Sequence, residues 1–311
     1  MKKWLIAFLL VLAVTIISIY FLLPSAITVV ETTAVKCPEA AVVRYLSDSS
    51  RWLKWWPKEK GSDRASLTFK GTRYHLSKIM YNAYDILLTD GKDSNTTRII
   101  LLPFGRDSVT IKWQASVLAG KSPYKKISNY FSAREKAQQL REILQRFSTY
   151  MQDPRNIYGY DLKLTTLTDT TLIATKITTP DYPDTKRIYE LVGLLKNYAT
   201  SNGAKITNYP MLNVRKDANG YLTMVALPLD RELKGEGDLF TKRMIIIKDN
   251  TLLLEVHGGI QTVQNAFGEL GNYMQDHNYG SPAIPFESLV TDRSMEPDTS
   301  KWVTRIFAPI M

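Results

Sequence analysis

The feature that most constrains the fold is an internal repeat in the C-terminal half of the chain. The segment "LIATKITTPDYPDTKRIYELVGLLKNYATSNG" leads into "YPMLNV" and "TMVALPL", and "LLLEVHGGIQTVQNAFGELGNYMQDHNYG" leads into "IPFESLV" and "TRIFAPI". In both copies a β-like run passes through a polar turn into an amphipathic helix, and two strands joined by a hairpin follow. This agreement predicts a tandem β-α-β-β duplication, with repeats at 165–229 and 243–311.

The helices of the two copies carry their apolar residues at the same spacing. These residues are Ile188, Leu191 and Leu195 in the first copy and Phe267, Leu270 and Met274 in the second. Both helices are followed by a glycine-type stop signal, "SNG" at 201–203 and "NYG" at 278–280. Each helix therefore has one apolar face, which we expect to cover one side of a sheet.

Residues 165–311 resemble the gyrase-inhibitor-like, effector-binding domain of AraC-type and multidrug-responsive regulators, chiefly in "GGIQTVQNAFGELGNYM", "PFESLVTD" and "TRIFAPI". The resemblance implies two repeats that enclose a pocket for a small molecule, often amphipathic or cationic; some members are hydrolases. Glu287 matches the family pattern, but Leu289 stands where a tyrosine is usual and Arg305 where the last strand usually has a glutamate. Arg305 would repel cations and removes a carboxylate that a general base needs.

The resemblance and the alternation of strand residues together predict the ligand-binding side chains. Glu287 and Arg305 are expected to be cross-strand or diagonal neighbours that face the hollow, where they neutralise each other or where Arg305 recognises an anionic or zwitterionic ligand. The alternative is that Arg305 extends into solvent and the hollow is vestigial. The candidate ligand-binding residues of this domain are Leu212, Val214, Met224, Glu287, Leu289, Arg305 and Phe307.

The pattern of residues 27–151 predicts a strand, a short helix opened by Pro38, several antiparallel strands and a long closing helix. Ser132 and Glu135 form a capping box at the expected start of that helix, and its apolar stripe is Ala137, Leu140, Ile143, Leu144, Phe147 and Met151. These elements predict an α+β sandwich in which the helix covers the sheet.

The stretch "TTAVKCPEAAVVRYLSDSSRWLKWWP" resembles the START-like, polyketide-cyclase superfamily (SRPBCC), and the resemblance covers residues 27–151. It implies a helix-grip fold with an apolar cavity between sheet and helix. Trp52, Trp55 and Trp56 are then candidate ligand-binding residues at the entrance of that cavity. The alternative is that these tryptophans pack the short helix onto the sheet. Residues 152–164 are expected to be the linker and entry strand between the two domains.

The N-terminal segment 1–26 contains an apolar run from Trp4 to Leu23, which is long enough to cross a bilayer as a helix. Lys2 and Lys3 precede the run, so the positive-inside rule predicts a single-pass anchor with a cytoplasmic N-terminus and both domains on the extracytoplasmic, periplasmic side. A cleaved signal peptide is the alternative, although the small-residue pattern around Pro24-Ser25-Ala26 is weak.

The rest of the sequence excludes several classes of function. Cys37 is the only cysteine, so neither an internal disulfide nor a thiolate metal site can form. The three histidines are far apart, and no nucleotide-binding or hydrolase motif occurs. The chain has a net charge of +10, but its basic residues are interleaved with acidic ones, so a nucleic-acid partner is not expected. Anionic lipid headgroups are the one partner that the charge alone suggests. No cofactor is predicted.

We therefore expect a membrane-anchored, non-catalytic protein that binds or senses a small hydrophobic or amphipathic molecule. The alternative is a hydrolase or cyclase that uses one of the two pockets.

Overall fold

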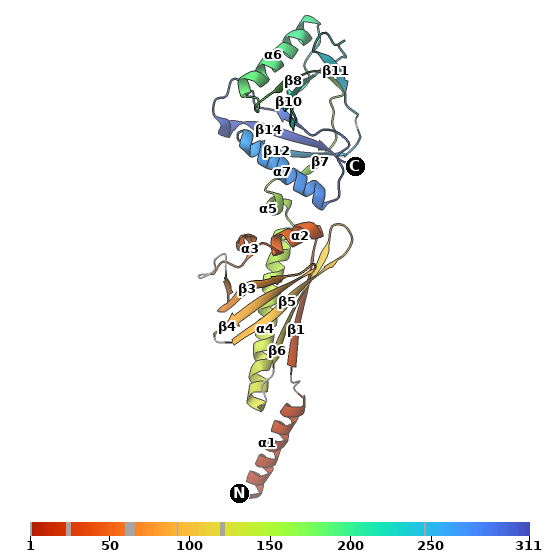
Figure 1. The fold of residues 1–311 in the computed structure, drawn as a ribbon. Helices are drawn as coiled ribbons and strands as arrows, with labels where there is room; N and C mark the ends of the chain where they lie inside the picture. Colours follow the sequence, from red (N-terminus) through yellow and green to blue (C-terminus); the bar gives the residue numbers. More distant parts are fainter. Residues whose placement is uncertain (1, 23–25, 60–65, 92, 119–121, 246) are drawn as a thin grey trace. The chain divides into compact units, whose positions relative to one another are not determined.

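The computed structural model describes residues 2–22, 26–59, 66–91, 93–118, 122–245 and 247–311. The chain divides into two compact units, unit 1 at Met1–Asp153 and unit 2 at Pro154–Met311. Each unit is α+β with one antiparallel sheet, so the predicted α+β class is confirmed (Figure 1). The units are described separately below.

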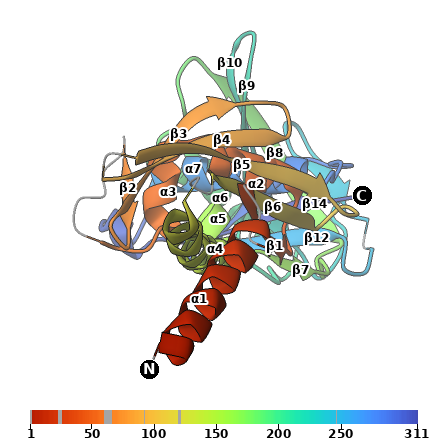
Figure 2. The ribbon, with the colours of Figure 1, turned by 90° about the horizontal axis from the view of Figure 1, so that it is seen from below.

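Unit 1 is a six-stranded antiparallel sheet with helices before and after it. The strand order is β1-β6-β5-β4-β3-β2. Its elements are α1 (Lys2–Leu22), β1 (Ala26–Val35), α2 (Glu39–Leu46), α3 (Ser49–Trp55), β2 (Leu67–Phe69), β3 (Thr72–Ile79), β4 (Ala83–Asp90), β5 (Asp93–Pro103), β6 (Val109–Leu118) and α4 (Pro123–Met151). Figure 2 shows α4 on one side of β3, β4 and β5, and α4 packs chiefly along β1. The expected sandwich of a sheet and a long helix is therefore present.

The long helix α4 begins at Pro123, about two and a half turns before the expected capping box, so the predicted start at Ser132 is wrong. Its N-cap is Ser122, whose side chain accepts a hydrogen bond from the Lys125 backbone N–H, and Pro123 follows in the first turn. Apolar residues in the first turns, such as Phe131, are exposed, so these turns lack the buried apolar stripe from which the helix was predicted. The predicted stripe covers only the part of α4 that packs on the sheet.

Helix α1 covers most of the N-terminal apolar run, and several of its side chains are exposed, including Trp4 and Phe21. The prediction of a membrane-spanning anchor is not supported, because no helix within the described residues combines the length and the apolarity needed to cross a bilayer. Pro24 and Ser25, where a cleavage site was considered, lie outside the described residues. The expected orientation and location of the two domains stay predictions.

Unit 2 is an eight-stranded antiparallel sheet built from two successive strand-helix-strand-strand segments. The first segment is β8 (Thr171–Thr179), α6 (Thr185–Ser201), β9 (Met211–Asp217) and β10 (Gly220–Pro228). The second is β12 (Thr251–His257), α7 (Ile260–Asp276), β13 (Phe286–Leu289) and β14 (Val303–Pro309). The remaining elements are α5 (Pro154–Tyr158), β7 (Lys163–Thr165), β11 (Phe240–Arg243) and a 3-10 turn (Thr299–Lys301). The predicted order of elements within each copy is observed.

The strand order of the second sheet shows how the two copies join. It reads β11-β8-β10-β9-β13-β14-β12-β7, so the sequence β8-β10-β9 is mirrored by β13-β14-β12. The two copies meet where β9 pairs with β13, with Leu212 opposite Glu287. Strands β11 and β7 extend the sheet at its two edges. The duplication therefore produces one continuous sheet rather than two.

Three chain reversals of unit 2 use residues with a positive φ. Gly220 closes the β9–β10 hairpin at φ 126°, and a Cβ at this position would clash with the Thr179 backbone oxygen. Gly203 follows the end of α6 at φ 68°, whereas after α7 the equivalent left-handed residue is Asn278 at φ 55°. Of the two predicted stop signals, "NYG" thus acts through its asparagine rather than its glycine.

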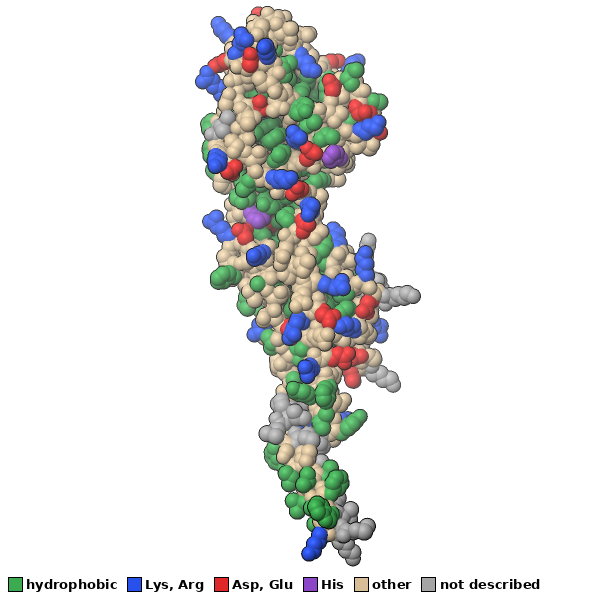
Figure 3. All heavy atoms as spheres, turned by 180° about the vertical axis from the view of Figure 1, so that it is seen from behind, with side chains coloured by type: hydrophobic (Ala, Val, Ile, Leu, Met, Phe, Trp, Pro, Cys, Tyr) green, Lys and Arg blue, Asp and Glu red, His purple; other side chains and the backbone are tan. Residues whose placement is uncertain are grey.

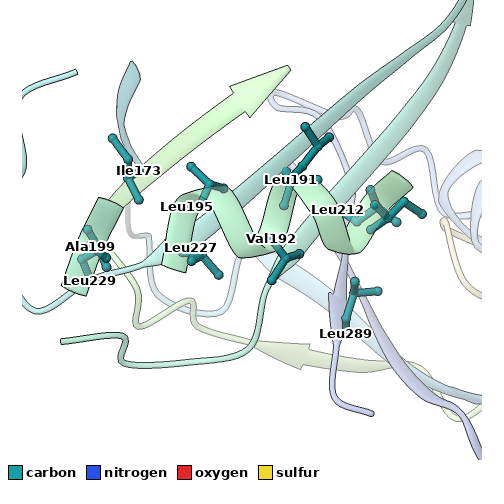
Figure 4. Packing of buried hydrophobic residues seen from close by; sticks show 11 residues of the cluster. Ile173, Leu191, Val192, Leu195, Ala199, Leu212, Leu227, Leu229 and Leu289 are labelled. Carbon is teal, nitrogen blue, oxygen red and sulfur yellow. The ribbon is translucent and has the colours of Figure 1, made fainter. Parts of the chain in front are cut away.

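Both long helices of unit 2 pack on the same side of the sheet, which we call the helix face. Leu289 packs under α6, and Ile306 packs under α7. The two residues lie on the same face of the sheet, because Leu289 shares a face with Glu287 and Glu287 is the register partner of Ile306. Figure 4 shows side chains of α6 beside those of several strands, among them Leu191, Val192, Leu195, Leu212, Leu227 and Leu289. The helix face is a packed core, and a ligand cavity must be sought on the other face.

Candidate ligand pocket on the open face of the second sheet

The face of the unit 2 sheet opposite α6 and α7, which we call the open face, carries a second apolar cluster. Its buried members are Leu167, Leu172, Ala174, Met211, Ala226 and Phe286, with Phe240, Met244 and Phe307 packed against them. These residues come from both copies and from β11 and the loop before β8. A small apolar core therefore lies on this face, and its members come from strands and connecting segments.

A cavity of about 300 Å³ opens into this cluster. Strands contribute Leu172, Met211, Leu212, Asn213, Met224, Ala226, Lys242, Arg243, Thr251, Phe286 and Pro309, and the connecting segments contribute Leu167, Met244, Ile245, Ile247, Asn250, Pro282, Ala283 and Ile284. The lining is predominantly apolar, with a few amide, hydroxyl and basic groups. This composition is typical of pockets that bind small organic molecules.

On the open face, the first copy has a small side chain at a position where the second copy has a large one. Ala226 of β10 pairs with Ala174, and Phe307 of β14, which aligns with Ala226 in the repeat, pairs with Leu253. The Phe307 ring stacks on Phe286 with the ring centroids 5.2 Å apart. The second copy therefore fills its part of the open face, and the first copy leaves space above Ala226.

Two basic residues line the cavity, and they differ in how their charge is compensated. Arg243 forms an ion pair with Glu232. Lys242 is half-buried, and its Nζ donates to the sulfur of Met224 at 3.7 Å. Lys242 pairs with Leu172 in the register of β11 and β8, which places its side chain on the open face. Among the described residues, no carboxylate forms an ion pair with Lys242.

The predicted pair of Glu287 and Arg305 does not form, because the two side chains lie on opposite faces of the sheet. Arg305 pairs with Ser288 in the register of β14 and β13, whereas Glu287 pairs with Ile306. Arg305 lies on the open face and is half-exposed, and its Nε donates to Glu255 Oε2 of β12 at 3.0 Å. The hydrogen bond from Arg305 holds the pKa of Glu255 below its ordinary value, against a smaller effect of burial.

Glu287 instead lies on the helix face, where Arg293 from the β13–β14 connection reaches it. Arg293 Nη2 donates to Glu287 Oε2 at 3.2 Å and to Thr304 Oγ1 at 2.7 Å, and the guanidinium carbon lies 4.9 Å from the centre of the Trp302 ring. Both charged side chains are almost completely buried. Burial raises the pKa of Glu287 above 4.5, and the charge of Arg293 opposes that rise.

The remaining predicted residues of unit 2 divide between the two faces. Met224 lines the cavity, and Phe307 packs beside it on the open face. Leu212 borders the cavity, but it belongs, with Leu289 and the half-buried Val214, to the core under α6. Glu287, Leu289, Val214, Arg305 and Phe307 are not among the residues that line the cavity.

The three candidate tryptophans of unit 1, Trp52, Trp55 and Trp56, pack against one another and against α4. Trp52 and Trp56 stack with centroids 5.7 Å apart, and Trp55 lies 4.6 Å from the Phe147 ring of α4. Trp52 Nε1 donates to the Leu46 carbonyl, and Trp56 Nε1 donates to the Thr68 carbonyl. Exposure of all three is 5% or less. This packing fits the alternative in which they fix the short helices, and a role at a cavity entrance stays a prediction.

Sequence reasoning missed Ala226, Lys242 and Arg293. The repeat already aligned "TMVALPL" with "TRIFAPI", so the exchange of alanine for phenylalanine was visible as a sign of space in one copy. Lys242 belongs to a short edge strand outside both copies of the β-α-β-β pattern. Arg293 lies in a connection, where a charged residue is normally solvated, and nothing local indicates that it turns inward.

No protein-family model matches the chain, and a search of curated proteins found no match. Among solved structures, the EcmrR C-terminal domain is 17% identical with a TM-score of 0.42, and the match covers 49% of this chain and 98% of that one. A hydrolase from Listeria innocua is 9% identical with a TM-score of 0.36, covering 49% of this chain and 91% of that one.

CalU16 from Micromonospora echinospora is 14% identical with a TM-score of 0.30, covering 40% of this chain and 74% of that one. Likenesses as distant as these carry no inference about what this chain binds or catalyses. The gyrase-inhibitor-like resemblance rests on the quoted motifs and the duplicated order of elements, and the START-like resemblance stays a prediction.

Proposed function

We propose that unit 2 binds a small apolar or amphipathic molecule in the cavity on its open face. The observation that carries the proposal is the cavity itself, a space of about 300 Å³ enclosed by aliphatic and methionine side chains. Ligand pockets in proteins start at about this size and have this mixture of apolar walls and few polar groups. Burying apolar ligand surface contributes about 25 cal/mol per Å².

The proposed activity is binding rather than turnover. Glu287, the carboxylate that the sequence pointed to, is buried on the helix face in an ion pair with Arg293 and does not line the cavity. The described residues that line the cavity include no aspartate, glutamate, histidine or cysteine. A general acid/base reaction in this cavity would therefore have no carboxylate or imidazole among the described lining residues, and Lys242 would be its one amine.

The test is a pair of variants of the full chain titrated with N-phenyl-1-naphthylamine, a neutral dye that fluoresces in apolar surroundings. Ala226→Phe gives the first copy the same side chain that the second copy has at the equivalent position, Phe307. The second copy shows that this kind of sheet accommodates a phenylalanine there. We expect this variant to lose at least about tenfold in affinity, because the ring fills the space that the dye needs.

Ala218→Phe is the matched control, because Ala218 is exposed at the tip of the β9–β10 hairpin. It should leave the affinity unchanged. If wild type and Ala226→Phe bind the dye equally well, the cavity is not the binding site and the proposal fails.

A further inference from the structure

We infer that the cavity selects organic anions with an apolar body, and that Lys242 holds the anionic group. This inference rests on the proposed function and adds the class of ligand to it. It begins from an imbalance of charge: the described lining contains Lys242 and Arg243 but no acidic side chain.

The position of Lys242 makes its ammonium group available to a ligand. Its Nζ contacts the sulfur of Met224, which is itself part of the cavity wall. A thioether sulfur is a weak acceptor, so this contact leaves the charge without a counter-ion. Arg243 differs, because Glu232 already neutralises it. The free positive charge at the cavity therefore belongs to Lys242.

A second lysine on the open face adds to the same imbalance. Lys176 of β8 is the direct register partner of Met224, so its side chain projects on the same face. The equivalent pair in the second copy is Glu255 and Arg305, which neutralise each other at 3.0 Å. Among the described residues, Lys176 has no carboxylate partner. The first copy thus presents positive charge where the second presents a closed ion pair.

The apolar walls strengthen the attraction that Lys242 exerts on an anion. A charge pair beside a low-dielectric wall interacts more strongly than the same pair in open water. A hydrogen bond from an ammonium group to an anionic oxygen is also stronger than one between neutral groups. A ligand with an apolar body and one anionic group would use both the wall and the lysine, whereas a cation would be repelled.

The experiment compares two dyes that share an anilinonaphthalene skeleton and differ in charge. 8-Anilinonaphthalene-1-sulfonate carries a sulfonate, and N-phenyl-1-naphthylamine is neutral. Both are titrated into the full chain and into Lys242→Met, Lys242→Arg and Lys216→Met. Lys216 lies on the β9–β10 hairpin beside the Tyr221 ring, away from the cavity lining, so Lys216→Met removes an equal charge elsewhere.

We expect Lys242→Met to weaken binding of the sulfonate about tenfold, since a charge-assisted hydrogen bond is lost, and to change binding of the neutral dye less than twofold. Lys242→Arg should retain most of the sulfonate affinity, and Lys216→Met should have no effect. Added salt should weaken sulfonate binding in wild type more than in Lys242→Met.

Two results would overturn the inference. Equal changes for both dyes in Lys242→Met would show that the lysine acts by shape rather than by charge, and an effect of Lys216→Met as large as that of Lys242→Met would show only general attraction to a basic protein. In both cases a neutral dye that still responds to Ala226→Phe would leave the proposed function standing. If Ala226→Phe leaves binding of the neutral dye unchanged, the proposed function itself is wrong.

Discussion

The two copies within unit 2 share the same order of strands and helix but differ in the side chains that they place on the open face. In the first copy Ala226 leaves space, and Lys176 faces Met224 across the strands. In the second, Phe307 fills the equivalent space, and Glu255 pairs with Arg305. A few side chains on four strands therefore distinguish the two halves of the sheet, although residues of the second copy such as Thr251, Phe286 and Pro309 also line the cavity.

The two faces of the sheet also differ in how far their paired acidic side chains are buried. Glu287 on the helix face is buried with Arg293, and burial raises its pKa. Glu255 on the open face is half-exposed beside Arg305, and its pKa is lowered. A buried pair is costly to break, whereas an exposed pair contributes little to stability.

Elsewhere on the surface, positive and negative side chains are interspersed rather than gathered by sign in the view of Figure 3.

The largest expected effect comes from removing one member of the buried pair. Arg293→Met should lower the free energy of unfolding by about 3–5 kcal/mol, because Glu287 is left without a partner in an apolar site. Urea unfolding of the full chain measures this loss. The matched control is Arg305→Met, which breaks the exposed pair and should cost about 0–1 kcal/mol. Equal losses in the two variants would contradict the distinction between the faces.

The loss in Arg293→Met should grow as the pH rises. Without Arg293, burial alone acts on Glu287 and its folded pKa moves further above the ordinary 4.5. A carboxyl group with a raised folded pKa binds its proton more tightly in the folded state. The contribution of Glu287 to stability is therefore fully present below pH 4.5 and is lost as the pH rises through the folded pKa. A loss that shrinks between pH 5 and pH 8 would mean that Glu287 is not buried as described.

A smaller effect should follow from opening the second copy. Phe307→Ala removes the ring that stacks on Phe286, and because Phe307 is half-buried we expect a loss of about 2 kcal/mol in the free energy of unfolding. Binding of N-phenyl-1-naphthylamine should not weaken, since the change adds space. Phe104→Ala, which truncates an exposed phenylalanine of unit 1, serves as the control. A stability equal to that of wild type would show that Phe307 does not fill the open face.

The sequence was sufficient for the repeated part of the fold because periodicity is a local property. The stripes of α6 and α7 and the alternation along the strands follow from residue spacing, and both copies are observed in the expected order. The long helix α4 was placed too late because its first turns have no apolar stripe to mark them.

The site was harder to predict because it depends on register between distant strands. A register that sets Glu287 opposite Ile306, rather than Arg305, puts the two charges on different faces, and one residue of slip decides this. Arg293 and Lys242 come from a connection and an edge strand, so neither periodicity nor the repeat locates them. The alanine and phenylalanine at the equivalent positions 226 and 307 were the one visible signal of the cavity.

Methyl NMR of the full chain labelled with ¹³C at the methionine methyl groups tests the central claim most directly. Met211, Met224 and Met244 line the cavity, whereas Met151 is buried in unit 1 and Met274 belongs to α7 and packs against the core on the helix face. Addition of N-phenyl-1-naphthylamine should shift the signals of the three lining methionines and leave those of Met151 and Met274 in place. Shifts confined to Met151 or Met274, or no shifts at saturating dye, would contradict a binding site on the open face.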